Sequence, residues 1–108
     1  MKSVDIIVKY IEENRLSQNQ VAQMVGVSRQ NLWDKLNKGN PRFNSLERIM
    51  RAFGFEIRIR KADGSDPEFD EECVLQKLRE TNFCVDSIES VIKSMGYVLE
   101  YEKKNGAP

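Results

Sequence analysis

The chain of 108 residues contains no histidine, only three prolines and only two cysteines. Histidine is the commonest acid or base near neutral pH and the commonest metal ligand, so its absence removes both roles. Cys73 and Cys84 are too few for a four-coordinate zinc site, and we expect both to be reduced residues of the core. The sequence also lacks a nucleophile–base pair and a phosphate-cradling glycine loop. We therefore predict no catalytic residue, no metal and no cofactor, and an enzyme is the most distant alternative.

Long apolar runs are also missing, since no uninterrupted apolar run exceeds three residues. Neither a membrane-spanning helix nor a secretory signal is therefore expected, and we predict a cytoplasmic protein without a membrane partner. Apolar residues make up 40% of the chain and charged residues 31%, which is enough to build a packed core. A chain of this length forms one small domain or two very small ones.

Net charge is zero, because seventeen basic residues balance seventeen acidic ones, but the two signs are unevenly distributed. Residues 1–61 hold twelve Lys/Arg against six Asp/Glu, a net charge of +6, whereas residues 62–108 hold five against eleven, a net charge of −6. A basic half favours a polyanionic partner such as nucleic acid.

Hydrophobic periodicity predicts four helices in the first half of the chain, each with a recognisable start signal. They are 3–14 capped by Ser3, 17–25 with the capping box Ser17–Gln20 before Gly26, 28–38 capped by Ser28 before Gly39, and 44–53 with the capping box Asn44–Glu47 before Gly54.

After Gly54 the period changes from 3.6 to 2, which predicts a half-buried strand over 55–60. A linker over 62–65 follows, and Asp66 and Pro67 are placed to start a fifth helix. A sixth helix is predicted from Asp86, with Glu89 completing its capping box, and a second strand is predicted from Tyr97. Residues 105–108 are expected to be a frayed tail.

The predicted fold class is mainly α with a small β component: a helix-turn-helix bundle over 1–61 that ends in a strand, then an acidic helix-helix-strand unit over 66–104. The second unit is expected to pack on the first or on a dimer partner. At an offset of 42, residues 31–64 and 73–106 are identical at eight of thirty-four positions, against about two expected by chance. Internal duplication and two similar motifs with shared capping residues both remain open.

The stretch from Gln18 to Leu36 meets the requirements of a helix-turn-helix, in which two short helices cross closely and the second enters a DNA groove. Ala22 provides the small residue for the crossing, and Gly26 can adopt the positive φ that a sharp turn needs.

These residues resemble the XRE/Cro-type helix-turn-helix family of repressors over roughly residues 4–54. The closest resemblance is to the addiction-module antidote branch, which shares a GxSRxxLYxxL run, a GNPxF loop and a closing LG before a strand. Here the run contains Trp33, and Lys35 replaces a position that is often apolar in the wider family, so that Leu36 takes the apolar role. The resemblance implies a five-helix DNA-binding domain and a homodimer on palindromic double-stranded DNA, and it does not cover residues 66–108.

At 100° per residue, the polar face of the third helix lies opposite Leu32 and Leu36. Candidate base-reading residues on or beside this face are Arg29, Gln30, Asn31 and Asp34, whose side chains suit guanine, adenine, adenine and cytosine respectively. Candidate phosphate contacts are Gln18 and Ser28 at helix N-termini and Lys35, Lys38 and Arg42. The alternative is a solvated helix surface on which Trp33 covers the first helix and Asp34 pairs with Lys38.

The two predicted strands carry opposite charges, Arg58 and Arg60 on one and Glu100 and Glu102 on the other. We expect them to share a sheet, within the chain or across a dimer. The predicted function is a sequence-specific DNA-binding regulator, and the resemblance implies a repressor. The alternative is an antitoxin-like interaction module that binds a toxin through its acidic half and regulates its own operon, although an acidic patch also serves as a solubilising surface.

Overall fold

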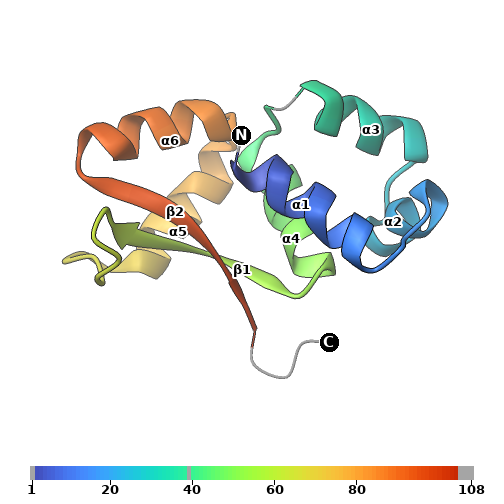
Figure 1. Ribbon diagram of the computed structural model, residues 1–108. Helices are drawn as coiled ribbons and strands as arrows, with labels where there is room; N and C mark the ends of the chain where they lie inside the picture. Colours follow the sequence, from blue (N-terminus) through green and yellow to red (C-terminus); the bar gives the residue numbers. More distant parts are fainter. Residues whose placement is uncertain (1, 39, 105–108) are drawn as a thin grey trace.

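The computed structural model describes residues 2–38 and 40–104, so the predicted helix end at Gly39 and the predicted tail at 105–108 lie outside the described residues. The described residues form six helices and two strands: α1 (Lys2–Glu13), α2 (Gln18–Val25), α3 (Arg29–Lys38), α4 (Phe43–Ala52), β1 (Phe55–Lys61), α5 (Glu71–Thr81), α6 (Val85–Ser94) and β2 (Tyr97–Lys103). The fold is mainly helical with one small sheet, as predicted. Helices α2 and α3 lie at one end of the molecule and α5 and α6 at the other (Figure 1).

The first four helices enclose a continuous apolar core. Ile7 of α1, Val21 of α2, Leu32 of α3 and Leu46 of α4 are all buried in it. Four helices precede β1, so the described chain does not form the five-helix domain that the resemblance implied. Helix α4 ends at Ala52, and Gly54, which has a φ of +83°, turns the chain into β1 at Phe55.

Several predicted helix starts are wrong, although the capping box of Ser17 and Gln20 is confirmed. Ser3 lies inside α1 and is buried instead of capping the helix. Helix α5 begins after Asp70, whose carboxylate accepts a hydrogen bond from the Cys73 N–H at 3.3 Å, and not at Asp66 and Pro67. Both cysteines are free. Cys73 is exposed, so the prediction that it belongs to the core is wrong, and Cys84 is half-buried.

The capping boxes predicted for α4 and α6 are also wrong, because distant asparagines bind these helix starts. The Asn44 N–H donates to Asn82 Oδ1 at 3.0 Å, and the Asp86 N–H donates to Asn40 Oδ1 at 3.2 Å. Helix α4 begins at Phe43 and α6 at Val85, and neither receives a side-chain cap from its own N-cap residue. Each helix start is therefore satisfied by the other half of the chain.

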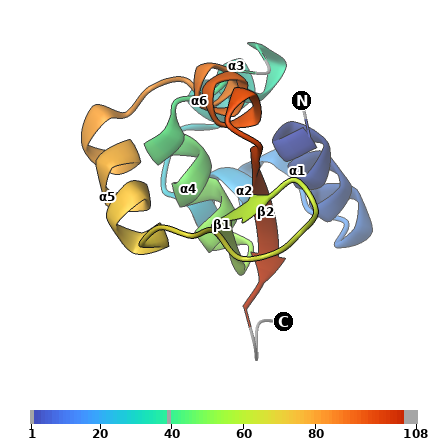
Figure 2. The same cartoon turned by 90° about the vertical axis from the view of Figure 1, so that its left-hand side faces the viewer.

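Strands β1 and β2 form one antiparallel sheet within the chain. Arg58 lies opposite Glu100 in the register, and Ile59 lies opposite Leu99. The buried face of the sheet carries Ile57, Ile59 and Leu99. The sheet thus joins the two halves of the sequence. Seen from the α5–α6 end of the molecule, the strands lie between α5 on one side and α1 on the other (Figure 2).

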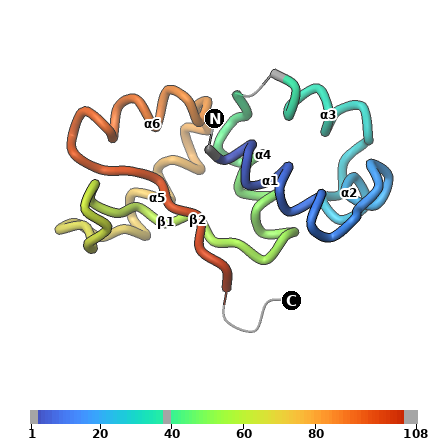
Figure 3. The backbone as a smooth tube through the Cα atoms, viewed as in Figure 1, coloured from blue at the N-terminus to red at the C-terminus, as the bar shows by residue number. Residues whose placement is uncertain are grey.

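The two halves are related by a pseudo-two-fold axis that passes between Arg42 and Cys84 and between Arg58 and Glu100, pairs of residues 42 positions apart. Shifting α4 and β1 by 42 residues gives the bounds of α6 and β2, and Figure 3 shows the course of both helix-helix-strand segments. Hydrogen bonds between the halves recur in exchanged form: Phe43 N–H to Phe83 O at 2.9 Å with Val85 N–H to Pro41 O at 2.8 Å, and Ala62 N–H to Gly96 O with Lys104 N–H to Gly54 O, both at 2.9 Å. These reciprocal contacts support the internal-duplication alternative.

Glu71 of α5 binds three consecutive residues of β1 at the junction of the halves. Its Oε2 atom accepts hydrogen bonds from the Ile59 N–H at 2.7 Å and from Arg60 at 2.8 Å, and its Oε1 atom lies 2.9 Å from Arg58 Nη2. Burial raises the pKa of Glu71, but the Ile59 N–H and the two guanidinium groups outweigh this effect and hold the pKa below its ordinary value.

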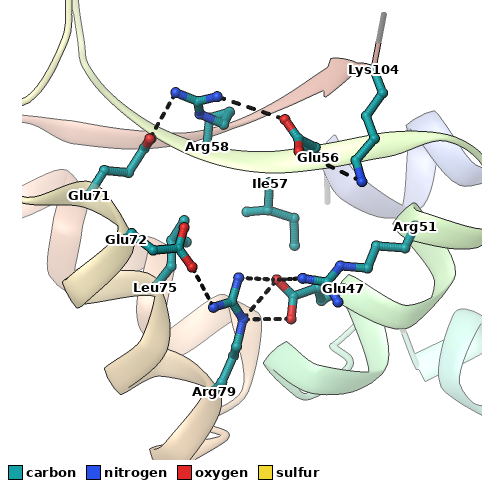
Figure 4. Close-up of a pocket in the computed structure, with 10 residues that line it drawn as sticks. All are labelled: Glu47, Arg51, Glu56, Ile57, Arg58, Glu71, Glu72, Leu75, Arg79 and Lys104. Carbon is teal, nitrogen blue, oxygen red and sulfur yellow. Dashed lines mark hydrogen bonds and ion pairs between the residues drawn. The ribbon is translucent and has the colours of Figure 1, made fainter. Parts of the chain in front are cut away.

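A second set of ion pairs joins α5 to α4. Arg79 donates to both carboxylate oxygens of Glu47, at 2.9 and 3.1 Å, and to Glu72 at 2.8 Å. Arg51 lies 3.7 Å from Glu47 on its other side. These side chains line a hollow of about 240 Å³, and they point toward one another across it (Figure 4). Paired charges of α4 and α5 therefore meet in this hollow.

We predict that Glu71→Gln lowers the free energy of unfolding by about 1–3 kcal/mol at pH 7, because two guanidinium groups lose their charged partner. The folded-state pKa of Glu71 is depressed, so its contribution is present above the unfolded value of about 4.3 and is lost as pH falls through the folded value. Urea denaturation at pH 7 and at pH 3 should show a smaller acid-induced loss in the variant than in the parent.

The matched control is Glu68→Gln. Glu68 pairs with Lys61 at 2.8 Å, but its side chain is 81% exposed, against 18% for Glu71. An exposed pair contributes about 0–1 kcal/mol, so this variant should stay close to the parent. Equal destabilisation by the two substitutions would contradict the role given to Glu71.

Candidate nucleic-acid interface

Helices α2 and α3 meet at a sharp turn around Gly26. Gly26 has a φ of +80°, and its N–H donates to the Ala22 carbonyl at 2.8 Å, which closes the end of α2. The Ser28 hydroxyl then accepts a hydrogen bond from the Asn31 N–H at 3.2 Å and caps α3. Ala22 and Leu32 are buried on the two helices. The local sequence therefore builds the helix-turn-helix in the way that the spacing predicts.

Arg48 of α4 holds this turn, a role that the sequence reasoning missed. Its Nη2 atom donates to the Gly26 carbonyl at 3.2 Å. Arg48 occupies an exposed position on α4, 22 residues from Gly26, and no local spacing connects the two. The turn is therefore fixed both by the αL conformation of Gly26 and by a charged donor from the helix behind it.

The four candidate base-reading residues lie on α3, and all four are exposed: Arg29, Gln30, Asn31 and Asp34. Leu32 and Leu36 are buried on the opposite side of the helix. Within the described side chains, no residue forms a hydrogen bond or an ion pair with the side chains of Arg29, Gln30 or Asp34. These three side chains are thus available to a ligand, while Trp33 packs partly buried against the core.

The candidate phosphate contacts occupy more varied positions. Gln18 is the exposed first residue of α2, and Ser28 immediately precedes α3. Lys35 is half-buried and donates to the Ser45 hydroxyl at 3.2 Å, and Arg42 donates to the Asn82 carbonyl at 3.1 Å. The side chain of Lys38 lies outside the described residues, and so does its expected pair with Asp34. Both described cations have neutral partners, so their charges are not compensated by these contacts.

Part of the base-reading face opens into a hollow of about 430 Å³ between α3 and the start of α4. Asn31 and Asp34 line it together with Lys35, Asn40 and Arg42. The hollow thus brings two base-reading candidates beside two of the phosphate candidates. These five residues come from α3 and from the loop before α4.

The basic charge of the first half is divided between two places. Arg58, Arg60 and Lys61 form ion pairs with acidic residues of the second half, so they do not contribute a free positive surface. Arg29, Lys35, Arg42 and Arg48 belong to the helix-turn-helix end of the molecule. The net charge of +6 counted along the sequence therefore overstates the field at α3.

Residues 7–58 match the family model described as the Cro/C1-type HTH DNA-binding domain. This stretch is a Cro/C1-type DNA-binding domain. The match begins within α1, ends within β1, and contains α2, α3 and α4 in full, whereas α5, α6 and β2 lie beyond it. No curated protein and no solved structure matches the chain. In the described part of the chain, no helix is both long and apolar enough to cross a lipid bilayer.

We predict that Gly26→Ala destabilises the Cro/C1-type domain by about 1–2 kcal/mol and weakens DNA binding. An alanine at positive φ is strained, and its Cβ would lie 2.9 Å from Arg48 Nη2, so the guanidinium group of Arg48 must shift. Thermal unfolding and a DNA-binding titration on the same protein measure the two effects.

Gly64→Ala is the matched control, because Gly64 has a φ of +89° but no atom within 4 Å of the added Cβ. It carries the conformational strain without the displacement of Arg48. DNA binding should be unchanged in this variant, and a loss equal to that of Gly26→Ala would show that backbone strain alone, without displacement of Arg48, accounts for the loss.

Proposed function

We propose that the protein is a sequence-specific transcriptional repressor that reads the DNA major groove with α3. The observation that carries this proposal is the exposed face of α3 on a Cro/C1-type domain, where Arg29, Gln30 and Asp34 have no partner among the described side chains. Polar groups that can pair with base edges, held on a rigid helix, are what direct readout requires. We expect such a regulator in the cytoplasm.

In this proposal each side chain on α3 has its own base preference. Arg29 donates to the O6 and N7 atoms of guanine, Gln30 and Asn31 pair with adenine, and Asp34 accepts from the N4 amine of cytosine. Each such pair discriminates against the wrong base by about 1–3 kcal/mol. The exposed carboxylate of Asp34 also repels phosphate, so it favours a docking in which it faces a base edge.

Phosphate contacts position the domain without reading the sequence. Gln18 and Ser28 lie where helix N-termini present N–H groups to an anion. Lys35 and Lys38 add positive charge in the second half of α3, and Arg42 adds it in the loop before α4. Lys35 and Arg42 each use one donor on a neutral oxygen and retain others for phosphate.

The antitoxin alternative depends on a free acidic surface, and this condition has little support. Glu68 pairs with Lys61, Glu71 with Arg58 and Arg60, and Glu72 with Arg79. Asp70 caps α5. These acidic residues pair with basic residues of the same chain, so a basic toxin would have to compete with these intramolecular ion pairs.

Selection of DNA from a random pool tests the proposal directly. The parent protein should enrich one motif, and the variant R29A/Q30A should lose its base preference at the positions that these side chains read. Lys9→Ala is a control that removes one exposed positive charge from α1. Its motif should be that of the parent, and failure of the parent to enrich any motif would overturn the proposal.

Salt dependence separates phosphate contacts from base contacts. Arg42→Ala should weaken binding to all sequences about equally and should reduce the slope of log affinity against log salt by about one unit. The preferred motif should not change in this variant. A changed motif with an unchanged slope would assign Arg42 to base reading instead.

A further inference from the structure

Helices α5 and α6 leave an apolar groove of about 520 Å³ open to solvent. Its lining is mostly apolar, and it includes Val74, Leu78, Phe83, Ile88 and Val91. Phe83 and Val91 are among the five large hydrophobic residues that are exposed in the described chain, and a third, Met95, follows α6 directly. Helices α5 and α6, which line the groove, lie at the other end of the molecule from α2 and α3 (Figure 1).

The pseudo-two-fold axis shows which kind of element normally covers such a face. The counterparts of Val74, Leu78 and Val91, 42 residues earlier, are Leu32, Leu36 and Ile49, and all three are buried. Ile49 is 1% exposed, whereas Val91 is 60% exposed. In the first half α1 and α2 pack on α3 and α4, but the described second half has no equivalent of these helices. The groove therefore has the form of a helix-binding face without its helix.

The outward face of α6 indicates which kind of partner could cover the groove. Ser87, Ser90 and Ser94 follow a spacing of three and four residues, so they form a narrow ridge along which another helix can approach closely. Val91 lies on the groove side of this ridge. Asp86 and Lys93 lie together on its other side, both exposed, and neither forms an ion pair with a described residue.

Two antiparallel copies of α6 satisfy both sides of the ridge at once. In an antiparallel helix pair the same flank of each helix faces its equivalent, so Asp86 of one copy lies beside Lys93 of the other, and this contact occurs twice. On the opposite flank, Val91 of each copy reaches the groove between α5 and α6 of the other. The arrangement is closed and self-complementary, as a two-fold interface requires.

We propose that a second copy of this chain covers the groove, with α6 packed antiparallel on α6. The sequence favoured a dimer through the strands as one of two arrangements, but β1 and β2 pair within the chain. No residue that lines the groove belongs to α3. This proposal does not depend on the proposed repressor function, and it supplies the two copies that a palindromic DNA site would need.

The first test is the mass of the full chain in solution, measured by light scattering at micromolar and higher concentrations. The chain has a mass of 12.5 kDa, so a dimer has about twice this mass. Val91→Glu places a charge in the groove and should raise the dimer dissociation constant by at least about tenfold, with the circular dichroism spectrum unchanged. Val8→Glu, at an exposed position on α1 away from the groove, should remain dimeric.

A charge exchange tests the antiparallel register and does not depend on Val91. Lys93→Asp should weaken the dimer, and the double variant D86K/K93D should restore it, because the pair is re-formed with its charges reversed. Asp86 near the start of α6 and Lys93 near its end also interact favourably with the helix dipole. If the two residues acted only through the dipole, the double variant would lose more thermal stability than Lys93→Asp and would not recover the dimer. Restored mass therefore identifies a contact between copies.

Two results would overturn the proposal. A parent protein that stays monomeric at high concentration has no second copy in its groove, and the occupant would then be a helix of another protein. A dimer that persists in Val91→Glu and in Lys93→Asp is formed through another face.

Discussion

The pairing of β1 with β2 is the contact on which the other contacts between the two halves depend. Its register places Arg58 opposite Glu100 and thereby sets the pseudo-two-fold axis. In this arrangement Asn40 lies at the start of α6 and Asn82 lies at the start of α4. Glu71 lies at the edge of β1, where it accepts from the Ile59 N–H. A two-stranded sheet is marginal alone, so these contacts from the helices stabilise it in return.

The same pairing explains how a chain of zero net charge can present a DNA-binding face. Basic residues of β1 and acidic residues at the start of α5 neutralise one another at the junction of the halves. The polar face of α3 lies away from this junction, and its side chains are not used in holding the fold together. Charge complementarity within the chain thus separates the structural role of β1 from the proposed reading role of α3.

Local signals in the sequence were enough to predict α2, α3 and both strands. Ser17 and Gln20, Gly26 and the alternation around Ile57 act over a few residues, so they are legible without the fold. The caps of α4 and α6 and the role of Arg48 were missed because they join residues 22 to 46 positions apart. The base-reading residues remain a prediction, since exposure on α3 shows that they are available and only DNA can show what they read.

The central claim is that the two halves of the chain fold and unfold as one unit because the second half stabilises the first. Native-state hydrogen exchange at the Ile59 amide tests this claim. This N–H donates to Glu71 and not to β2, so its protection reports the docking of α5 directly. The account predicts that it opens with the same free energy as core amides of α4 such as that of Ile49. Exchange of Ile59 at a free energy several kcal/mol lower, with α4 still protected, would show that the second half detaches independently and would contradict the account.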